Sequence, residues 1–344
     1  MRIAIDVTGG DNAPDAILDG AIQARELLGP DDQIVLLGDE AVIRESLQEA
    51  GVGRDPRFTI EPTSQTIGMD ETPVDALRDK PDSSIARLGW LGSKRAGDQR
   101  VEIVISAGNT GAMVASAQMS MRRLPGVHRP GIAVTMPTFH GPVVLCDVGA
   151  NIVPKPHHLH QYGHMASLFA HEVIGIEDPR VCLLSVGGEE TKGTGLVKDT
   201  NKLMRCDPSI NYHGYIEGRG LFDGQADVIV TEGFTGNVVL KLAEGLAAGL
   251  FRTIAHEIFE EDPNMAMQFE PVVKKIYAKH DWHEFGGAPL LGVNGNCIIC
   301  HGSSEARTIR SAVRNAVAYM NHQVNEKIVE RLAEAQKAVG EVDI

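Results

Sequence analysis

The sequence lacks the features that would place it in a membrane or on a nucleic acid. None of its 344 residues fall in a run of about 18 apolar residues, so we expect no transmembrane helix. The start, MRIAIDVTGG, has no charged segment followed by an apolar one, so we expect no signal peptide and a cytoplasmic protein. The sequence has no long Lys/Arg run and a formal net charge of −14, which argues against nucleic acid as a partner.

Cysteine is scarce and unevenly spaced, and we expect all of it to be reduced and buried. The five positions are Cys146, Cys182, Cys206, Cys297 and Cys300. The last two, with His301, match the C-x-x-C-H string of covalent haem attachment. The segment has strand character, however, so residues three apart should point to opposite faces. We therefore interpret Cys297 and Cys300 as core residues.

Three common catalytic motifs are missing. No G-x-G-x-x-G follows a predicted strand and no G-x-x-x-x-G-K-[ST] occurs, which argues against nicotinamide-dependent hydride transfer and against phosphate transfer from a nucleotide. G-x-S-x-G is also absent, which favours attack by a small bound nucleophile over an acyl-enzyme. The string His157-His158-Leu159-His160 matches no standard zinc spacing, so we interpret it as a partly exposed polar segment.

What the sequence does contain is a repeated strand–loop–helix pattern. Hydrophobic residues make up 43% of the chain and charged residues 23%, as in ordinary globular proteins. Short runs rich in Val and Ile, typical of strands buried on both faces, precede Gly-containing loops and helical patterns. These runs cover residues 3–6, 33–38, 101–106, 142–148, 181–186 and 227–232. They predict one large domain, 1–344, with a doubly wound, mostly parallel α/β sheet and helices on both faces.

Two long helical stretches stand apart from this pattern. Residues Val238 to Lys279 are helical except at EEDPN, 260–264, which is a turn signal. We expect a helical hairpin over 238–280 that projects from the domain. Residues Ala306 to Ala338 predict one long helix, and residues 285–295 predict an irregular loop that leads into a buried strand.

The loops that follow the strands carry the candidate chemistry, because open α/β sheets bind ligands there. Two of them repeat a Gly-x-Thr-Gly motif at a helix start, which favours an anion and suggests a site for two anionic groups. The candidate substrate-binding residues are Asp6, Gly9, Gly10, Asp11, Asn12, Ser106, Gly108, Asn109, Thr110, Gly111, Asp147, Asn151, Glu190, Gly233, Thr235 and Gly236.

Lys192 and Asn237 are the candidate catalytic residues. Lys192 is a cation in a Gly-rich loop, suited to phosphate or to a developing oxyanion, although it is equally placed to pair with Glu189 and Glu190. Asn237 lies at a predicted helix start and is either an amide donor to that oxyanion or an ordinary capping residue.

The motifs resemble, in order and over almost the whole chain, those of the bacterial phosphate acyltransferases of phospholipid synthesis. The matching strings are IAIDVTGGDNAP (3–14), PVDALRDKPDSSI (73–85), ISAGNTGAM (105–113), LCDVGAN (145–151), EETKG (189–193), EGFTGNVVLK (232–241), GGAPLLGVNG (286–295) and HGSSEARTI (301–309). The chain departs from the usual pattern at Val7, Thr8, Gly188, Tyr215 and Gly220, so the role of loop 211–220 does not transfer.

The resemblance implies transfer of an acyl chain from acyl carrier protein to inorganic phosphate, reversibly and without a metal or organic cofactor. It also implies a fold similar to phosphotransacetylases and isocitrate dehydrogenases, a homodimer, and loose contact with the inner face of the membrane. The product would feed a membrane glycerol-3-phosphate acyltransferase. The competing hypotheses are a decarboxylating nicotinamide-dependent dehydrogenase and a non-catalytic module that binds the carrier or the membrane.

Two surface features are candidates for partners. Arg122, Arg123, His128 and Arg129 form a local basic group that suits an acidic carrier, or are simply solvated. The hairpin tip combines apolar residues with lysines, which suits either a membrane interface or packing in a dimer interface or in the core. Its apolar residues are Met265, Met267, Phe269, Val272, Val273, Ile276 and Tyr277, and its lysines are Lys274, Lys275 and Lys279.

Overall fold

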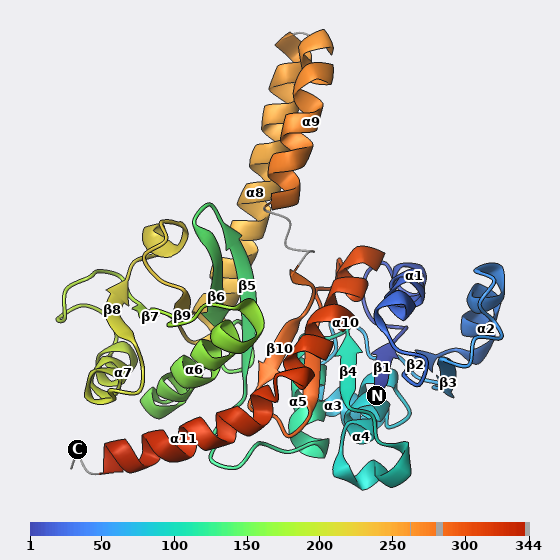
Figure 1. Ribbon diagram of the computed structural model, residues 1–344, viewed down its shortest axis with the longest axis horizontal. Coiled ribbons are helices and arrows are strands. Elements are labelled where there is room, and N and C mark those ends of the chain that lie inside the picture. Colours follow the sequence, from blue (N-terminus) through green and yellow to red (C-terminus); the bar gives the residue numbers. More distant parts are fainter. Residues whose placement is uncertain (262, 280–284, 341–344) are drawn as a thin grey trace.

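One sheet organises the molecule (Figure 1). The computed structural model describes residues 1–261, 263–279 and 285–340. In these residues eleven strands lie in the order β3-β2-β1-β4-β11-β10-β5-β6-β9-β7-β8. They are β1 (Arg2–Asp6), β2 (Gln33–Gly38), β3 (Phe58–Pro62), β4 (Ile103–Ser106), β5 (Gly131–Thr138), β6 (Gly141–Cys146), β7 (Val181–Leu184), β8 (Tyr212–Ile216), β9 (Val228–Val230), β10 (Ala288–Leu291) and β11 (Asn296–Ile299).

The sheet consists of two parallel groups that run in opposite directions. Strands β3, β2, β1, β4 and β11 are parallel to one another and form the first group. Strands β6, β9, β7 and β8 form the second group. Between the groups, β10 and β5 make three successive antiparallel pairings, which reverse the strand direction. The predicted mostly parallel sheet is confirmed, but with this reversal at its centre.

Helices cover both faces of the sheet. They are α1 (Asp15–Ala24), α2 (Glu40–Glu49), α3 (Pro73–Asp79), α4 (Ser84–Leu91), α5 (Thr110–Ser120), α6 (Pro156–Phe169), α7 (Gly195–Cys206), α8 (Gly233–Glu261), α9 (Pro263–Lys279), α10 (Ala306–Asn321) and α11 (Val324–Gly340). The buried residues of α3, α4, α5 and α8 belong to one apolar cluster, on one face. Those of α1, α2 and α10, and of α6, α7 and α11, belong to clusters on the other face.

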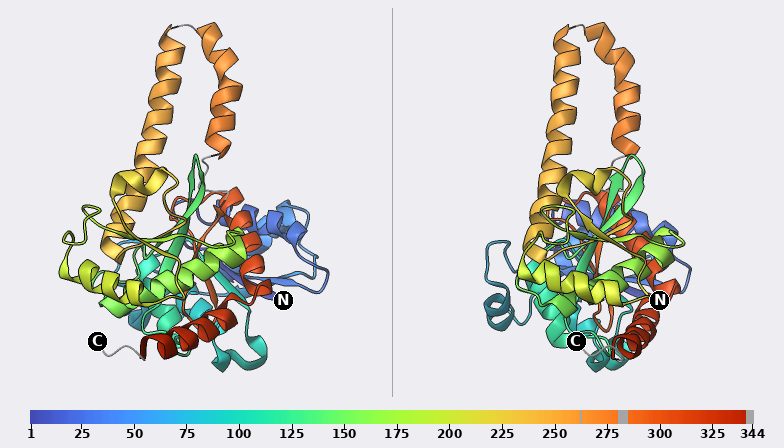
Figure 2. Two further views of the ribbon diagram at one scale, coloured as in Figure 1. Left: turned by 60° about the vertical axis from the view of Figure 1, so that its left-hand side comes forward. Right: turned by 90° about the vertical axis from the view of Figure 1, so that its left-hand side faces the viewer.

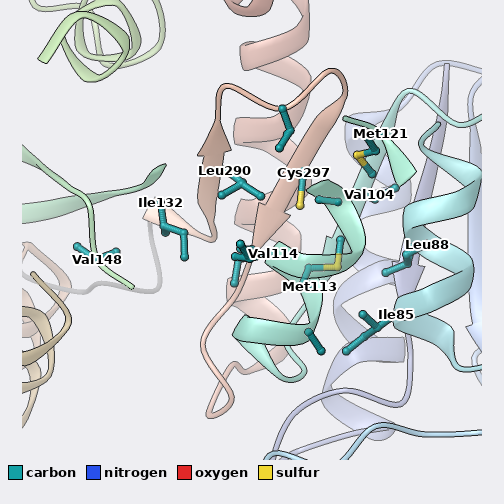
Figure 3. Packing of buried hydrophobic residues seen from close by; sticks show 14 of the residues in the cluster. Ile85, Leu88, Val104, Met113, Val114, Met121, Ile132, Val148, Leu290 and Cys297 are labelled. Carbon is teal, nitrogen blue, oxygen red and sulfur yellow. The ribbon is translucent and has the colours of Figure 1, made fainter. Parts of the chain in front are cut away.

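The core joins the two strand groups on the face covered by α5. Figure 3 shows this cluster passing from Met113 and Val114 of α5, across Leu290 of β10, to Ile132 and Val148 in the second half of the sheet. Side chains alternate between the faces with the period of two expected of strands. Cys297 accordingly packs in this cluster and Cys300 in a cluster on the opposite face, which confirms the prediction for both.

The predicted hairpin is present and projects from the sheet domain (Figures 1 and 2). It consists of the outer part of α8 together with α9, which pack side by side. Among the described residues, no helix combines the length and apolarity that crossing a membrane requires.

Several local predictions were wrong. The tail is two helices, because the chain breaks at Gln323, whose φ of 53° lies in the left-handed region. The segment 285–295 contains strand β10 rather than only a loop, and residues 212–216 of the atypical segment form the edge strand β8. Cys206 is exposed, whereas the other four cysteines are buried as predicted.

Candidate functional site

The candidate loops lie at two opposite edges of the sheet. The loops after β1 and β4, residues 6–14 and 106–111, leave the carboxyl ends of the first strand group; we call this place the first edge. The loops after β6, β7 and β9, residues 147–151, 187–193 and 233–237, leave the carboxyl ends of the second group at the second edge. Because the groups run in opposite directions, the two Gly-x-Thr-Gly loops do not form one site within a chain, which corrects that expectation.

At the first edge, buried polar side chains tie the two loops together. The Ser106 hydroxyl donates to the Asp6 carboxylate at 2.7 Å and accepts from the Gly108 amide at 3.0 Å. The Thr8 amide donates to the other oxygen of Asp6 at 3.0 Å. A Cβ on Gly9 would lie 2.6 Å from the Gly108 nitrogen, so glycine is needed there for the close approach of the loops.

Asn109 caps helix α5 and holds a third segment at this edge. Its side-chain oxygen accepts from the Ala112 amide at 3.0 Å, and its amide nitrogen donates to the carbonyls of Gly68, Met69 and Glu71. The neighbouring amides of Thr110 and Gly111 have no acceptor recorded among the described residues. The α5 start therefore keeps donors free for an anion.

The loop 6–14 is also tied to the segment after β11. The Asp11 amide donates to the Gly302 carbonyl at 2.7 Å, and the Asn12 side chain donates to the carbonyls of Ser303 and Ser304. Gly10 has a φ of 107°, which a residue with a side chain rarely adopts.

At the second edge, Asp147 is the centre of a buried network. Its carboxylate accepts from the amides of Ile132, Gly149, Ala150 and Asn151 at 2.7–3.2 Å. Burial raises the pKa of Asp147 above its usual value, although these hydrogen bonds oppose the shift. The Asn151 side chain donates to the Pro130 carbonyl and to the Tyr162 hydroxyl.

The same loop packs directly on the start of α8. The Gly233 amide donates to the Asn151 carbonyl at 2.8 Å, and a Cβ on Gly236 would collide with the Asp147 carbonyl oxygen. A side chain at either position would collide with the backbone of the 147–151 loop, so glycine is needed there whether or not a ligand binds.

A carboxylate already occupies the amides at the start of α8. Glu232 accepts from the Phe234 amide at 2.7 Å, from the Thr235 amide at 2.8 Å, and from the Thr235 hydroxyl. The anion site that the motif predicted at 233–237 is therefore already occupied by the carboxylate of Glu232. An added anion would be repelled by its negative charge.

Lys192 and Asn237 keep their polar groups available. Glu190 pairs with Arg205 at 2.8 Å, and among the described residues no ion pair joins Lys192 to a carboxylate. The alternative of a lysine neutralised by the adjacent glutamates is therefore wrong. Asn237 is the fifth residue of α8, half-buried and beyond the cap position, and the described part of the chain gives its side chain no hydrogen-bond partner. The two residues follow neighbouring parallel strands, β7 and β9.

Basic and apolar side chains border the second edge. Arg122 and Arg123 line a pocket of about 470 Å³ where the chain leaves α5, and Arg129 precedes Pro130, which Asn151 contacts. Four exposed apolar side chains lie on or next to the three loops: Ile152 (66% exposed), Val153 (88%), Val186 (82%) and Phe234 (64%). The second edge therefore combines cationic groups with an apolar surface.

The histidine string is more buried than predicted. It forms the first turns of α6, and His158 and His160 are buried. Burial and the neighbouring His157 lower the pKa of His158 to about 4, and burial also lowers the pKa of His157. The string packs against the basic group, since the His128 and His157 rings lie 4.8 Å apart.

Burial indicates a structural role for several of the predicted site residues. Asp6, Ser106, Asn109 and Asp147 are buried and bonded to their own loops, so we assign them to holding the loops rather than to touching substrate. Glu190 is exposed but engaged by Arg205. Sequence reasoning missed Glu232 as a cap, because Asn, Asp, Ser and Thr are the usual capping residues and Glu is not.

Comparisons with known proteins agree with this architecture. Residues 1–327 match the model of the family described as "Fatty acid synthesis protein". A phosphate acyltransferase from Heliobacterium modesticaldum is 44% identical over 320 residues, which are 92% of this chain and 93% of that protein.

Solved structures share the fold at low sequence identity. A phosphotransacetylase from Streptococcus pyogenes superposes with a TM-score of 0.60 at 16% identity, covering 93% of this chain and 94% of that one. A branched-chain phosphotransacylase from Enterococcus faecalis gives 0.55 at 14% identity, covering 92% and 98%.

Proposed function

Since this chain belongs to the phosphate acyltransferase family, it is an enzyme that transfers an acyl group to phosphate, and we propose that its acyl donor is a fatty acyl thioester of acyl carrier protein. The resemblance carried by the sequence motifs is confirmed by these relatives. Lys192 and Asn237 at the second edge support this proposal, because within the described residues no ion pair engages the Lys192 ammonium and no hydrogen bond engages the Asn237 amide. The two residues follow neighbouring strands.

We propose that Lys192 and Asn237 act on the thioester carbonyl and on phosphate. Phosphate dianion attacks the carbonyl carbon through one oxygen, and the carbonyl oxygen becomes an oxyanion. The ammonium of Lys192 and the amide of Asn237 are the donors for this charge. Collapse breaks the C–S bond, releases the carrier thiolate and leaves acyl-phosphate. A dianion needs no general base, and holding both reactants in place lowers the entropic barrier.

The surroundings of the second edge suit such a donor. The exposed side chains of Ile152, Val153, Val186 and Phe234 offer apolar contact to an acyl chain. We propose that the basic group, Arg122, Arg123, His128 and Arg129, receives an acidic carrier protein, because charge complementarity speeds encounter and orients the partner. The amides of Thr110 and Gly111 at the first edge, which have no acceptor among the described residues, remain a separate proposed anion site.

An exposed apolar row on α8 favours a homodimer. Val238, Leu242, Leu246, Leu250 and Ile254 recur every four residues along about 24 Å of helix, and all are exposed in the single chain. A continuous apolar stripe of this length is typical of a protein interface. We propose that a second copy of the chain covers it.

The hairpin is the proposed contact with the inner face of the membrane. Met267, Phe269, Val272 and Ile276 of α9 are exposed, and Lys275 lies beside them, whereas Lys274 pairs with Glu270 at 2.6 Å. The side chains of Met265, Tyr277 and Lys279 lie outside the described residues. An interfacial enzyme would release acyl-phosphate where a membrane glycerol-3-phosphate acyltransferase uses it. We test this contact by vesicle sedimentation of a Met267→Ser/Phe269→Gln variant, and unchanged binding would remove the proposal.

The reaction is tested by incubating the protein with a long-chain acyl carrier protein, with and without inorganic phosphate. We expect thioester loss only with phosphate, a product that hydroxylamine traps, and the reverse reaction from acyl-phosphate. Nicotinamide cofactors should have no effect, and EDTA should not inhibit. Equal thioester loss without phosphate would indicate a hydrolase, no loss would favour a binding module, and nicotinamide reduction would favour a dehydrogenase. Phosphate or sulfate density beside Gly108–Gly111 or Gly233–Asn237 would locate the anion.

A further inference from the structure

Two histidines and an aspartate lie together between helix α6 and the carboxyl end of helix α7. His160 and His164 lie one turn apart on α6, and Asp207 caps the carboxyl end of α7. The Nε2 atoms of both histidines lie 2.8 Å from the same carboxylate oxygen, Oδ2 of Asp207. The side chains are 11%, 1% and 0% exposed, in that order. Within the described residues these three form a group of potential metal ligands whose ligand atoms all lie within 4.8 Å of one another.

The carboxylate of Asp207 lies fully buried between the two histidines. Its Oδ1 accepts from the Ser209 amide at 2.9 Å and from the Ser209 hydroxyl, and its Oδ2 faces both imidazole rings. In the described chain, no Lys or Arg forms an ion pair with Asp207; the nearby Arg331 of α11 donates instead to the Ser209 carbonyl at 3.0 Å. Buried charges are usually paired or bound to a metal.

We propose that His160, His164 and Asp207 bind one divalent transition-metal ion, of which Zn²⁺ is the reference. Two imidazoles and a carboxylate are a common ligand set for this ion, and a fourth position is left for water on the side of His160, the most exposed of the three. Metal–ligand bonds of about 2.0 Å place tetrahedral ligand atoms about 3.3 Å apart, so the cluster has to open by roughly 0.5 Å.

Two features of the site limit its affinity. The other ring nitrogen of His164, Nδ1, is buried without a partner, whereas metal-bound histidines usually donate this N–H to an acceptor. Arg331 also places positive charge near His164. Both effects weaken binding, so we expect micromolar rather than nanomolar affinity.

The proposed metal would stabilise the fold and take no part in the reaction. Helix α6 follows the loop of Asp147 and Asn151, and α7 follows the loop of Lys192. A metal bound between α6 and the end of α7 would therefore join the supports of two second-edge loops. We expect binding to raise Tm while leaving the metal-free protein folded.

The test compares metal content and stability of the full chain. After dialysis against EDTA and then against 100 µM Zn²⁺ (about ten times an expected Kd of about 10 µM), elemental analysis should give about 0.9 zinc per chain in the unmodified protein. A His160→Gln/His164→Gln variant should retain little zinc. The control, His213→Gln/His256→Gln, removes two exposed histidines and should keep it. Co²⁺ should give a visible absorption band in the unmodified protein only.

A second variant distinguishes loss of zinc binding from loss of folding. Asp207→Asn keeps an oxygen that can accept from the histidines but removes the charge, so we expect circular dichroism as in the unmodified protein and at least tenfold weaker zinc binding. Zinc content unchanged in the double variant would place the metal on His157, His158 or the surface and overturn the proposal. Absence of zinc from the unmodified protein at 100 µM, about ten times the expected Kd, would also overturn it.

Discussion

The two Gly-x-Thr-Gly helix starts share a local sequence and differ in electrostatics. At α5, the cap is the neutral amide of Asn109, and the amides of Thr110 and Gly111 lack a recorded acceptor among the described residues. At α8, the Glu232 carboxylate accepts from two amides and a hydroxyl. One residue before the motif, Ala107 in the first copy and Glu232 in the second, accounts for this difference.

A glycine-rich helix start is therefore an anion site only if the chain leaves its donors free. In the second copy the glycines allow close backbone packing, whereas in the first copy their Cβ positions face side chains. At the second edge, positive charge for a substrate has to come from a side chain, and Lys192 is the cation that the described loops leave unpaired there.

The largest effect is expected from the free groups of the second edge. Lys192→Ala and Asn237→Ala should each lower kcat by about 10²–10³, because each removes a donor to the developing oxyanion. Neither side chain has a recorded hydrogen bond in the described structure, so urea unfolding should show little change in stability. The control is Lys202→Ala, an exposed lysine of α7 that pairs with Asp199. Turnover near the unmodified rate in both variants would move the reacting centre away from this edge.

The contacts around the glycines predict that a Gly→Ala change lowers the free energy of unfolding more at the start of α8 than at the start of α5. Gly236→Ala drives a methyl group into the Asp147 carbonyl and should lower the free energy of unfolding by about 3 kcal/mol. Gly111→Ala places its Cβ 2.6 Å from Pro73 Cγ, a contact with a side chain rather than with backbone, and should cost about 1 kcal/mol. Urea unfolding of both variants measures the difference, and equal costs would contradict the packing argument.

A fall in pH should lower the free energy of unfolding through the buried His158. The folded-state pKa of His158 is about 4, below its unfolded value of 6.5, so the unfolded chain binds more protons in this window. Its contribution is complete above pH 6.5 and is lost as the pH falls towards 4, by about 2 kcal/mol at pH 4.5. His158→Gln should flatten the fall in unfolding free energy between pH 7 and 4.5. The exposed His213→Gln should not, and an identical pH profile in both variants would rule out His158 as the cause.

Removing the charge of Glu232 should make the two helix starts more alike. In Glu232→Gln an amide oxygen still caps α8, while the repulsion of an incoming anion is gone. We expect KM for phosphate to fall about two- to fivefold with kcat unchanged, the range that follows from about 0.3–1 kcal/mol at a helix end. Steady-state kinetics against phosphate provide the measurement, with the exposed Glu257→Gln as control. An unchanged KM would favour phosphate binding at the first edge.

The smallest effect is expected at the exposed cysteine. Cys206→Ser should leave turnover unchanged, since no covalent intermediate on sulfur is needed. A thiol reagent should label one cysteine in the folded protein, and none in this variant, because the other four are buried. Loss of turnover on Cys206→Ser would revive a covalent mechanism.

The sequence predicts the elements better than their directions. Runs such as 33–38 and 181–186 stand out because strands buried on both faces are continuously apolar. Strand β5 was missed, and β10 was hidden in a segment rich in glycine and proline. These two strands reverse the sheet, and their pairing depends on residues more than 100 positions apart. Loops that follow one another in sequence therefore separate in space.

Side-chain partners were harder to predict than loops. Residues 157–160 alone match no zinc spacing, whereas His160 meets His164 one turn on and Asp207 from another helix. The availability of Lys192 depends on Arg205 engaging Glu190, a pairing set by where α7 lies. Contacts between elements of this kind are not encoded by local spacing.

The position of β11 between β4 and β10 has a consequence for how the chain is made. All strands of the second group and β5 lie between residues 131 and 230, so they can pair as soon as that stretch leaves the ribosome. Strand β4 is complete at Ser106 but meets its second neighbour only at Asn296–Ile299. The first group therefore exposes an unpaired strand edge while some 190 further residues, the hairpin included, are synthesised. Strand β5 likewise waits for β10, Ala288–Leu291, so during that interval each half of the nascent sheet exposes one unpaired edge.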